Sequence, residues 1–240
     1  MVRRLKSTGL EKRPRGADER GCETEDLVIV HRTFRWMFRE LPLLVAAVPD
    51  GDAERTKVVA DHVSFVSSRL HGHHEAEDLV LWDRITDRAP ACALHVDDMR
   101  RQHAEVAGLL GDLDPLVPAW RERADAATRD RIVAASEAVR DTLERHLGEE
   151  EAEIVPVAAV VLTQREWDGM GEHVQKELTL ASFPVTLGLH LASVSERERT
   201  EWIDENLPAP FRLAWRLLWR RRYEAAMDRL YAGAPVPPIA

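Results

Sequence analysis

The sequence predicts an all-α protein, an up-down-up-down four-helix bundle with a C-terminal helical extension. Ala, Leu, Glu and Arg dominate its 240 residues, whereas runs of β-branched and aromatic residues bounded by turns are scarce. Four long segments carry apolar residues at helical spacing, with breaks that contain Pro or Gly between them. Shorter helical patterns follow the fourth segment. An ordinary apolar fraction of 45% supplies enough residues for a well-buried core.

The four long helices are bounded by local breaker sequences. The first is expected over residues 25–48, before the turn at residues 49–52, and the second over residues 53–88, before Pro90. The third is expected over residues 92–111, because residues 111–115 and Pro118 interrupt the pattern. The fourth is expected over residues 126–161, with Pro156 kinking its last turns.

The chain divides into three parts. Residues 1–22 are polar and lack periodicity, which predicts a disordered basic tail. Residues 23–161 are expected to form the bundle, and residues 162–240 a helical extension packing on it. Helices are expected there at residues 164–180, at 196–206 with Ser195 as N-cap, and at 210–231. The last is amphipathic, and we expect it to fold back over the bundle; contact with a membrane surface or a partner is the alternative.

Charge and composition exclude several classes of protein. A formal net charge of −9 argues against a duplex nucleic-acid partner, because phosphate binding needs a positive surface. No stretch approaches the roughly 18–20 apolar residues of a membrane span, so no integral membrane association is expected. The basic start lacks the apolar segment of a secretory signal, and two cysteines make neither a disulfide framework nor a zinc site. We therefore expect a cytoplasmic protein.

Polar residues interrupt the apolar stripe of every long helix. Burying an unpaired imidazole or carboxylate costs several kcal/mol, so these residues need partners in the core. Residues i and i+4 of a helix lie on one face, about 5–6 Å apart, so two of the helices can each offer a nitrogen and an oxygen to one site. The residues are His31 in the first helix, His73 and Glu77 in the second, His103 in the third, and His146 and Glu150 in the fourth.

Turn positions place these residues at one height in the bundle. In antiparallel helices, two residues at equal height have the connecting turn midway between them. The midpoint of His31 and His73 is residue 52, and that of Glu77 and His103 is residue 90. The midpoint of His103 and His146 falls just after the third break. A repeat of H-x3-E-[DE], in HHEAEDLVLWD and HLGEEEAEIVP, further suggests two helix pairs that each supply half of a dinuclear site.

A nitrogen and oxygen donor set without sulfur suits iron or manganese, with zinc possible. Two glutamates between two metal ions would bridge them, and the histidines would take outer positions. A metal-free bundle whose polar core is hydrogen-bonded internally is the alternative.

The motifs around His31 (LVIVHRTFR), His73 (HHEAEDLVLW), His103 (RRQHAEVAGLL) and His146 together resemble the hemerythrin-like, HHE cation-binding family over roughly residues 23–160. The C-terminal segment is similar to the tail of many actinobacterial members. The resemblance implies an oxo- or hydroxo-bridged di-iron centre in a four-helix bundle. The implied ligands are His31, His73, Glu77, His103, His146 and Glu150.

One position departs from the family pattern. Oxygen-carrying hemerythrins place two histidines one turn apart on the third helix, whereas Met99 stands four residues before His103 here. His74 or a water molecule would then complete the site. His74, Glu75 and Asp78 are expected to lie beside the ligands rather than to bind the metal. His74 and Asp78 are nevertheless secondary ligand candidates. The remaining neighbours are expected to be structural (His62, His71, His95) or solvated (Glu149, Glu151).

The incomplete histidine shell favours redox chemistry over oxygen carriage. The first hypothesis is a non-haem di-iron protein that handles hydrogen peroxide, oxygen or nitric oxide, which leaves enzymatic turnover undecided. The alternative is an oxygen- or iron-sensing or metal-binding module that signals to a protein partner, not identified by the sequence, through the C-terminal extension.

Overall fold

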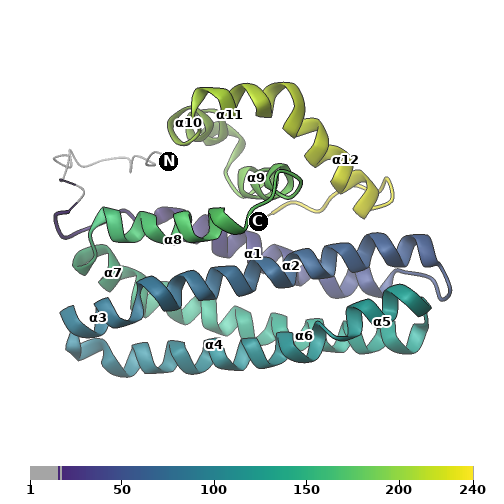
Figure 1. Ribbon diagram of the computed structural model, residues 1–240, viewed down its shortest axis with the longest axis horizontal. Helices are drawn as coiled ribbons and strands as arrows, with labels where there is room; N and C mark the ends of the chain where they lie inside the picture. Colours follow the sequence, from purple (N-terminus) through teal and green to yellow (C-terminus); the bar gives the residue numbers. More distant parts are fainter. Residues whose placement is uncertain (1–15, 17, 240) are drawn as a thin grey trace.

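The computed structural model describes residue 16 and residues 18–239. Four long antiparallel helices form the bundle, with their connections alternating between its two ends (Figure 1). They are α1 (Glu25–Ala46), α2 (Ala53–Val80), α4 (Ala93–Leu113) and α6 (Ala126–Glu149). The described residues hold no β-strand; residues 20–21 and Thr163 make isolated bridges. The predicted all-α bundle with C-terminal helices is confirmed.

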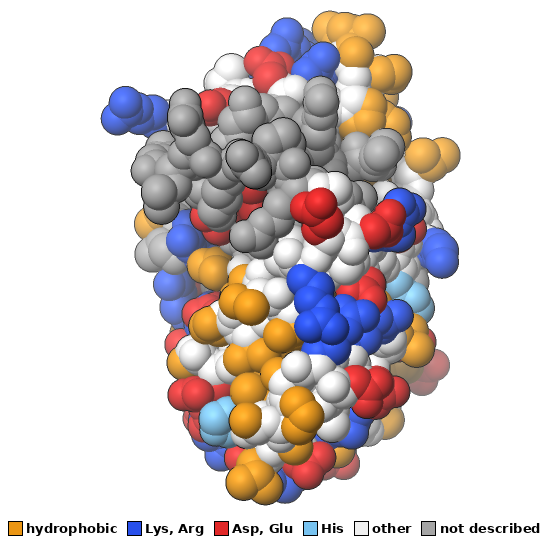
Figure 2. Space-filling view, turned by 90° about the vertical axis from the view of Figure 1, so that its left-hand side faces the viewer, with side chains coloured by type: hydrophobic (Ala, Val, Ile, Leu, Met, Phe, Trp, Pro, Cys, Tyr) orange, Lys and Arg blue, Asp and Glu red, His pale blue; other side chains and the backbone are white. Residues whose placement is uncertain are grey.

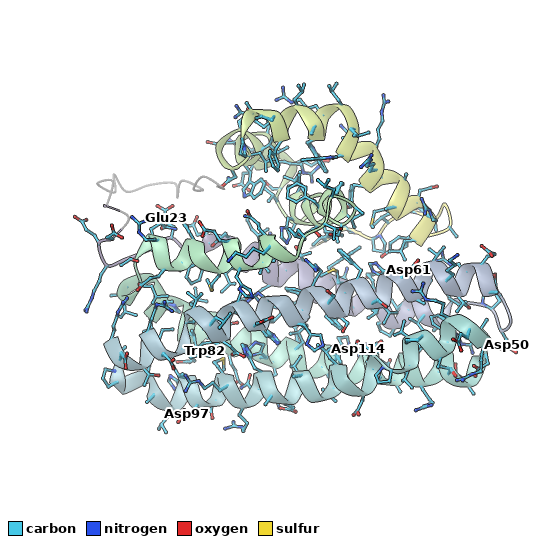
Figure 3. The ribbon with its side chains drawn as sticks, in the orientation of Figure 1. Glu23, Asp50, Asp61, Trp82, Asp97 and Asp114 are labelled. Carbon is cyan, nitrogen blue, oxygen red and sulfur yellow. The ribbon has the colours of Figure 1, made fainter. Side chains whose placement is uncertain are left out.

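The turn after α1 contacts the residues around the start of α6, at the same end of the bundle. Gly51 adopts a φ of 77°, a left-handed conformation that glycine tolerates best, and its N–H donates to the Ala124 carbonyl at 2.8 Å. The Asp50 carboxylate accepts from the Ala126 N–H at 2.7 Å. The helices that begin here have aspartate N-caps, Asp52 and Asp125. Asp50 marks this end of the molecule in Figure 3.

The expected break after the third helix is wrong in part, because residues 116–123 form a further helix, α5 (Leu116–Arg123). Pro115 precedes this helix and Pro118 lies in its first turn. The first N–H groups of a helix have no partner inside it, so a proline there costs no hydrogen bond. Both prolines therefore permit a helix start where the sequence suggested a loop.

The second long helix has a short interruption. α2 ends at Val80, and α3 (Trp82–Arg88) continues after Leu81. The Arg84 guanidinium donates to the carbonyls of Leu79 and Val80, at 3.2 and 2.7 Å. The single turn η1 (Pro90–Cys92) then leads into α4. Residues 53–88, which the sequence predicts as one helix, are thus helical except at Leu81.

Pro156 changes the end of the fourth helix. A π-helical segment, η2 (Glu150–Ile154), joins α6 to α7 (Val155–Val161). Proline has no N–H to donate and its ring crowds the carbonyl four residues earlier, so a regular α-helix cannot run through it. The Val155 N–H instead bonds the Glu150 carbonyl five residues back. The expected distortion falls on the turn that begins at Glu150.

The bundle interior has a polar layer between two apolar ones. One apolar layer includes Phe34, Leu70, Val106 and Leu143. The other includes Leu27, Leu81, Met99, Trp82 and Ile154. The histidines and glutamates of each helix lie in the sequence between a residue of the first layer and a residue of the second, so the helices bring them to one level.

The extension packs on α1 and α2. It consists of α8 (Gln164–Glu177), α9 (Phe183–Ala192), α10 (Glu196–Asn206), α11 (Ala209–Ala214), the π-helical segment η3 (Trp215–Trp219) and α12 (Arg220–Leu230). α8 runs beside α2 (Figure 1) and begins with a capping box between Thr163 and Glu166. Ser195 caps α10, as the sequence predicts.

Helix α9 was not predicted, because it is apolar on nearly all sides. Leu189 joins the core of the bundle, while Leu187 and Leu191 join a second core with Trp202 and Trp215. A helix buried on two faces lacks the amphipathic pattern by which a surface helix is found. Its packing makes the extension continuous with the bundle.

The end of the chain is tied to α1 and α2. Met227 and Leu230 lie in the bundle core. The Trp36 indole donates to the Pro237 carbonyl at 3.2 Å, and Arg55 donates to the Arg229 carbonyl at 2.7 Å. Among the described residues, no helix is long and apolar enough to cross a membrane.

Most of the expected disordered tail, residues 1–22, lies outside the described residues. Its described end contacts the start of α8: the Gly21 N–H donates to the Leu162 carbonyl at 2.7 Å, and Asp18 pairs with Arg165. Cys22 is buried against α7, where its thiol donates to the Ala158 carbonyl. Residues 18–22 therefore have defined contacts.

Candidate metal centre

The structure brings the six predicted ligands together in the polar layer. The Glu77 carboxylate lies between two imidazoles, 3.3 Å from His73 Nε2 and 3.6 Å from His103 Nε2. The Glu150 carboxylate lies likewise between His31 Nε2 at 3.4 Å and His146 Nε2 at 3.8 Å. Each glutamate thus lies beside the histidine four residues before it and one histidine of another helix.

His74 also points into this layer. Its ring stacks on His103, with centroids 4.1 Å apart, and meets His146 edge-on at 5.0 Å. Donor atoms of His74, Glu77, His103 and His146 lie within 4.8 Å of one another, and so do those of His31, His73 and Glu77. Glu77 belongs to both groups. His74, a secondary candidate in the sequence, therefore lies among the primary ones.

Met99 does not take part. It is 2% exposed and packs in the apolar layer with Trp82 and Ile154. The third long helix thus contributes a single histidine to the site, and the second contributes two adjacent ones. His74 thus brings a further imidazole into the polar layer, whereas Met99 brings no nitrogen.

The converging atoms are buried and unpaired. They are the Nε2 atoms of His31, His73, His74, His103 and His146 and all four carboxylate oxygens of Glu77 and Glu150, and none has a hydrogen-bond partner among the described residues. Each such group costs about 1–3 kcal/mol when buried without a partner. We call these five histidines and two glutamates the donor cluster. Electron-pair donors that face one another are stabilised by cations. This observation favours a metal centre over a hydrogen-bonded polar core.

Comparison with known families matches residues 22–158 to the hemerythrin HHE cation-binding domain. The chain belongs to the hemerythrin family. Comparison with curated proteins and with solved structures finds no significant match. The match covers the four long helices and the whole donor cluster, so cation binding is established at the level of the family, and the unpaired donors fit it.

Burial shifts the pKa values of the glutamates and histidines in the donor cluster. Burial raises the pKa of Glu150 to about 8, with further repulsion from Glu151 and Asp78. Burial and the Glu150 charge raise the pKa of Glu77 well above its usual value. Burial lowers the pKa of His73 and His74 well below their usual value and that of His146 to about 3. Burial thus favours the neutral form of both glutamates and of the imidazoles of His73, His74 and His146, and a neutral imidazole is the form that binds metals.

Hydrogen bonds at Nδ1 fix the orientation of His103 and His146. His103 Nδ1 lies 2.7 Å from the Asp78 carboxylate, which also accepts from the Trp82 indole at 2.5 Å. His146 Nδ1 lies 3.2 Å from Gln102 Oε1. When Nδ1 is the protonated nitrogen, Nε2 presents its lone pair to the core. Asp78 thus orients the His103 ring from outside the donor cluster.

His31 has a comparable support. Its Nδ1 lies 2.9 Å from Glu151, and Arg35 donates to the same carboxylate oxygen at 2.7 Å. Burial alone would raise the pKa of Glu151, but these two hydrogen bonds lower it to about 2. The expectation that Glu151 is solvated is wrong, because a histidine and an arginine of α1 face it. Sequence reasoning missed Arg35 and Gln102 as well, because their partners Glu151 and His146 belong to other helical segments, distant in the sequence.

The histidines assigned structural roles lie outside the cluster. His62 stacks on Phe65, and burial lowers its pKa to about 4. His71 contacts Asp114 at 3.3 Å. His95 lies 3.8 Å from Glu153 at the surface. None of these three histidines belongs to a group of possible metal ligands with Glu77 or Glu150.

Proposed function

We propose that this hemerythrin-family protein holds two iron ions between Glu77 and Glu150 and handles a small oxidant there: hydrogen peroxide, oxygen or nitric oxide. The single observation that carries the proposal is the convergence of five imidazole nitrogens and four carboxylate oxygens without partners. Manganese and zinc accept the same donors, and iron is proposed because it is the metal typical of the hemerythrin family.

The donors divide unequally. One group gathers His74, His103 and His146, and the other has only His31 and His73; the two carboxylates lie between them. The ion held by the second group would have the fewer nitrogen ligands. A small molecule would then take a ligand position of that ion, beside His31 and His73.

A pair of iron ions supplies one-electron steps and binding of oxygen, peroxide or nitric oxide. The chain supplies position and exclusion of water. Phe34 lies against His73, with ring centroids 5.0 Å apart, and Trp82 lies against His103 at 5.3 Å. The five histidines are at most 6% exposed. A donor set closed off in this way admits small molecules and keeps bulk water and larger reductants away.

Metal content tests the proposal first. Protein purified without added metal or chelator is expected to contain about two irons per chain by plasma mass spectrometry, in line with a bridged dinuclear site. Glu77→Ala should lose the metal, whereas Glu137→Ala, an exposed change on α6, should keep it. Negligible metal, with no uptake on anaerobic addition of Fe(II), would establish the metal-free interpretation instead.

The reaction is tested on the iron-loaded protein. Hydrogen peroxide, oxygen and nitric oxide are each mixed with it under single-turnover conditions and followed by absorbance. Consumption of at least one of them, abolished by Glu77→Ala and kept by Glu137→Ala, is expected. A loaded protein inert toward all three would leave a metal site without the proposed activity.

One observation favours the sensory alternative. Arg32 and Thr33, the two residues after His31, both bind Ser193 of the extension: Arg32 donates to its carbonyl at 2.7 Å, and the Thr33 and Ser193 hydroxyls lie 2.7 Å apart. A shift of His31 would thus reach the link between α9 and α10. Oxidation-dependent protease sensitivity within residues 162–240 is expected for a sensor; identical cleavage in both redox states would contradict it.

A further inference from the structure

The long C-terminal helix exposes an apolar face. In the segment formed by α11, η3 and α12, Phe211 is 40%, Leu213 58%, Leu217 65% and Leu218 46% exposed. Leu213 and Leu217 are four residues apart, so they lie on one side of the helix. Scattered apolar residues are normal at a surface, but four within eight positions of one helix form a patch. We call these four residues the apolar patch.

The other side of the same helix holds it to the protein. Trp215 is buried with Leu187, and Met227 joins the core of the bundle. The Trp219 ring packs against Phe183, with centroids 5.0 Å apart. Phe211 lies at the margin of the apolar patch, because its ring is 40% exposed and also contacts Trp219 at 5.4 Å. The apolar patch is therefore displayed by a helix fixed from behind, and the leucines are left outside after the tryptophans have been buried. Covering the bundle, the role expected from the sequence, does not use them.

Basic side chains adjoin the apolar patch. Five arginines stand between residues 212 and 222: Arg212, Arg216, Arg220, Arg221 and Arg222. Arg221 and Arg222 follow Leu217 and Leu218 by one helical turn, and neither has an ion pair with another described residue. Figure 2 shows hydrophobic side chains beside both basic and acidic ones at the upper end of the molecule, where α10 and α11 lie (Figure 1). Of these arginines, Arg212 and Arg216 pair with Asp204 of α10, and Arg220 pairs with Glu224, so the unpaired positive charge beside the apolar patch is that of Arg221 and Arg222.

We propose that this face binds the surface of a bilayer that contains anionic lipid. Leucines beside arginines on one fixed helix match the division of such a surface into acyl chains and anionic headgroups. The protein would lie on the membrane without crossing it. The donor cluster is not needed for this contact, so the proposal is independent of the metal chemistry.

A second copy of the chain fits the patch less well. The exposed parts of its four side chains amount to roughly 400 Å², if a large apolar side chain is taken as about 200 Å². A stable interface buries roughly 800 Å² per partner. A two-fold contact would also bring the arginine clusters of both copies toward one another. Protein interfaces moreover favour Trp and Tyr as anchors, whereas here the outward residues are mainly leucines, which are rare as anchors.

Co-sedimentation of the full-length protein with vesicles tests the proposal. One set of vesicles is pure phosphatidylcholine, and the other is phosphatidylcholine mixed with phosphatidylglycerol. The wild type is expected to bind the second set and to be released by salt, because charge attraction is screened. Leu213→Ser with Leu217→Ser should remove most of the binding. Arg221→Gln with Arg222→Gln should weaken it by about fivefold per arginine.

Matched controls separate this face from general effects. Lys57→Gln with Arg131→Gln makes the same change of charge at exposed positions elsewhere, and Leu94→Ser with Val160→Ser removes exposed apolar residues at the other end of the molecule. Both controls should bind like the wild type, and circular dichroism should show every variant folded. Absence of wild-type binding, equal binding to both vesicle sets, or equal loss in the controls would overturn the proposal. So would a wild-type dimer that becomes monomeric in Leu213→Ser with Leu217→Ser.

Discussion

Replacing Glu77 by methionine should make the metal-free protein more stable and the metal-loaded protein less so. The Glu77 side chain is 1% exposed, and neither of its oxygens has a hydrogen-bond partner among the described residues. Its raised pKa means that without a cation the carboxyl group tends to remain protonated in the core. Methionine has a similar length, no polar oxygen and a flexible chain that adapts to its surroundings.

The magnitude follows from the burial. A buried polar group without a partner costs about 1–3 kcal/mol, so Glu77→Met should raise the free energy of unfolding of the metal-free protein by about 2 kcal/mol. In a chain of this size, 1 kcal/mol shifts the melting temperature by roughly 2–4 °C, which gives an increase of roughly 4–8 °C. In the wild type a ligand at 100 times its Kd adds about 2.7 kcal/mol, and the variant should lose this gain.

Thermal unfolding followed by circular dichroism measures both effects, once with chelator and once after anaerobic loading with Fe(II). The order of the two proteins should reverse between the two conditions. Glu137→Met, at a side chain that is 50% exposed, should follow the wild type in both. A Glu77→Met protein that melts below the wild type with chelator, and still gains stability on loading, would refute the view that Glu77 is present for a cation.

Three further predictions concern one contact of the donor cluster and two contacts of the C-terminal extension. Asp78→Ala removes the acceptor shared by His103 and Trp82 and should weaken metal affinity about 10–100-fold in a chelator competition while leaving the metal stoichiometry unchanged; unaltered affinity would show that the contact does not orient His103. Leu189→Ala, at a residue 1% exposed between α9 and the bundle, should cost about 2–5 kcal/mol in urea unfolding, and a loss typical of a surface change would contradict the docking of the extension. Hydrogen bonds from Arg88 lower the pKa of Glu166 from 4.5 to about 2, so its ionised form stabilises the folded state above pH 4.5 and this contribution is lost as the pH falls toward 2. The stability difference between the wild type and Glu166→Gln should shrink over that window in urea unfolding, and a gap independent of pH would rule out this linkage.

The sequence by itself determined the bundle and the level of its polar layer. Helical periodicity placed His73 with Glu77 and His146 with Glu150 on single faces, because the i, i+4 relation is a local property of the helix. Turn positions then fixed the heights, because residues that are equidistant from a turn meet in an antiparallel pair. The structure brings those side chains together. These features depend only on local rules and on helix lengths.

Tertiary packing decided the rest. His74 follows His73 directly and would be expected on a different face, yet both reach the core, where His74 stacks on a ring of another long helix. Glu151 is one of three consecutive glutamates, and its role depends on Arg35 across the bundle. Helix α9 escapes detection because two cores cover it. In each case the decisive partner is distant in sequence, and local periodicity carries no information about which residue of another helix lies opposite.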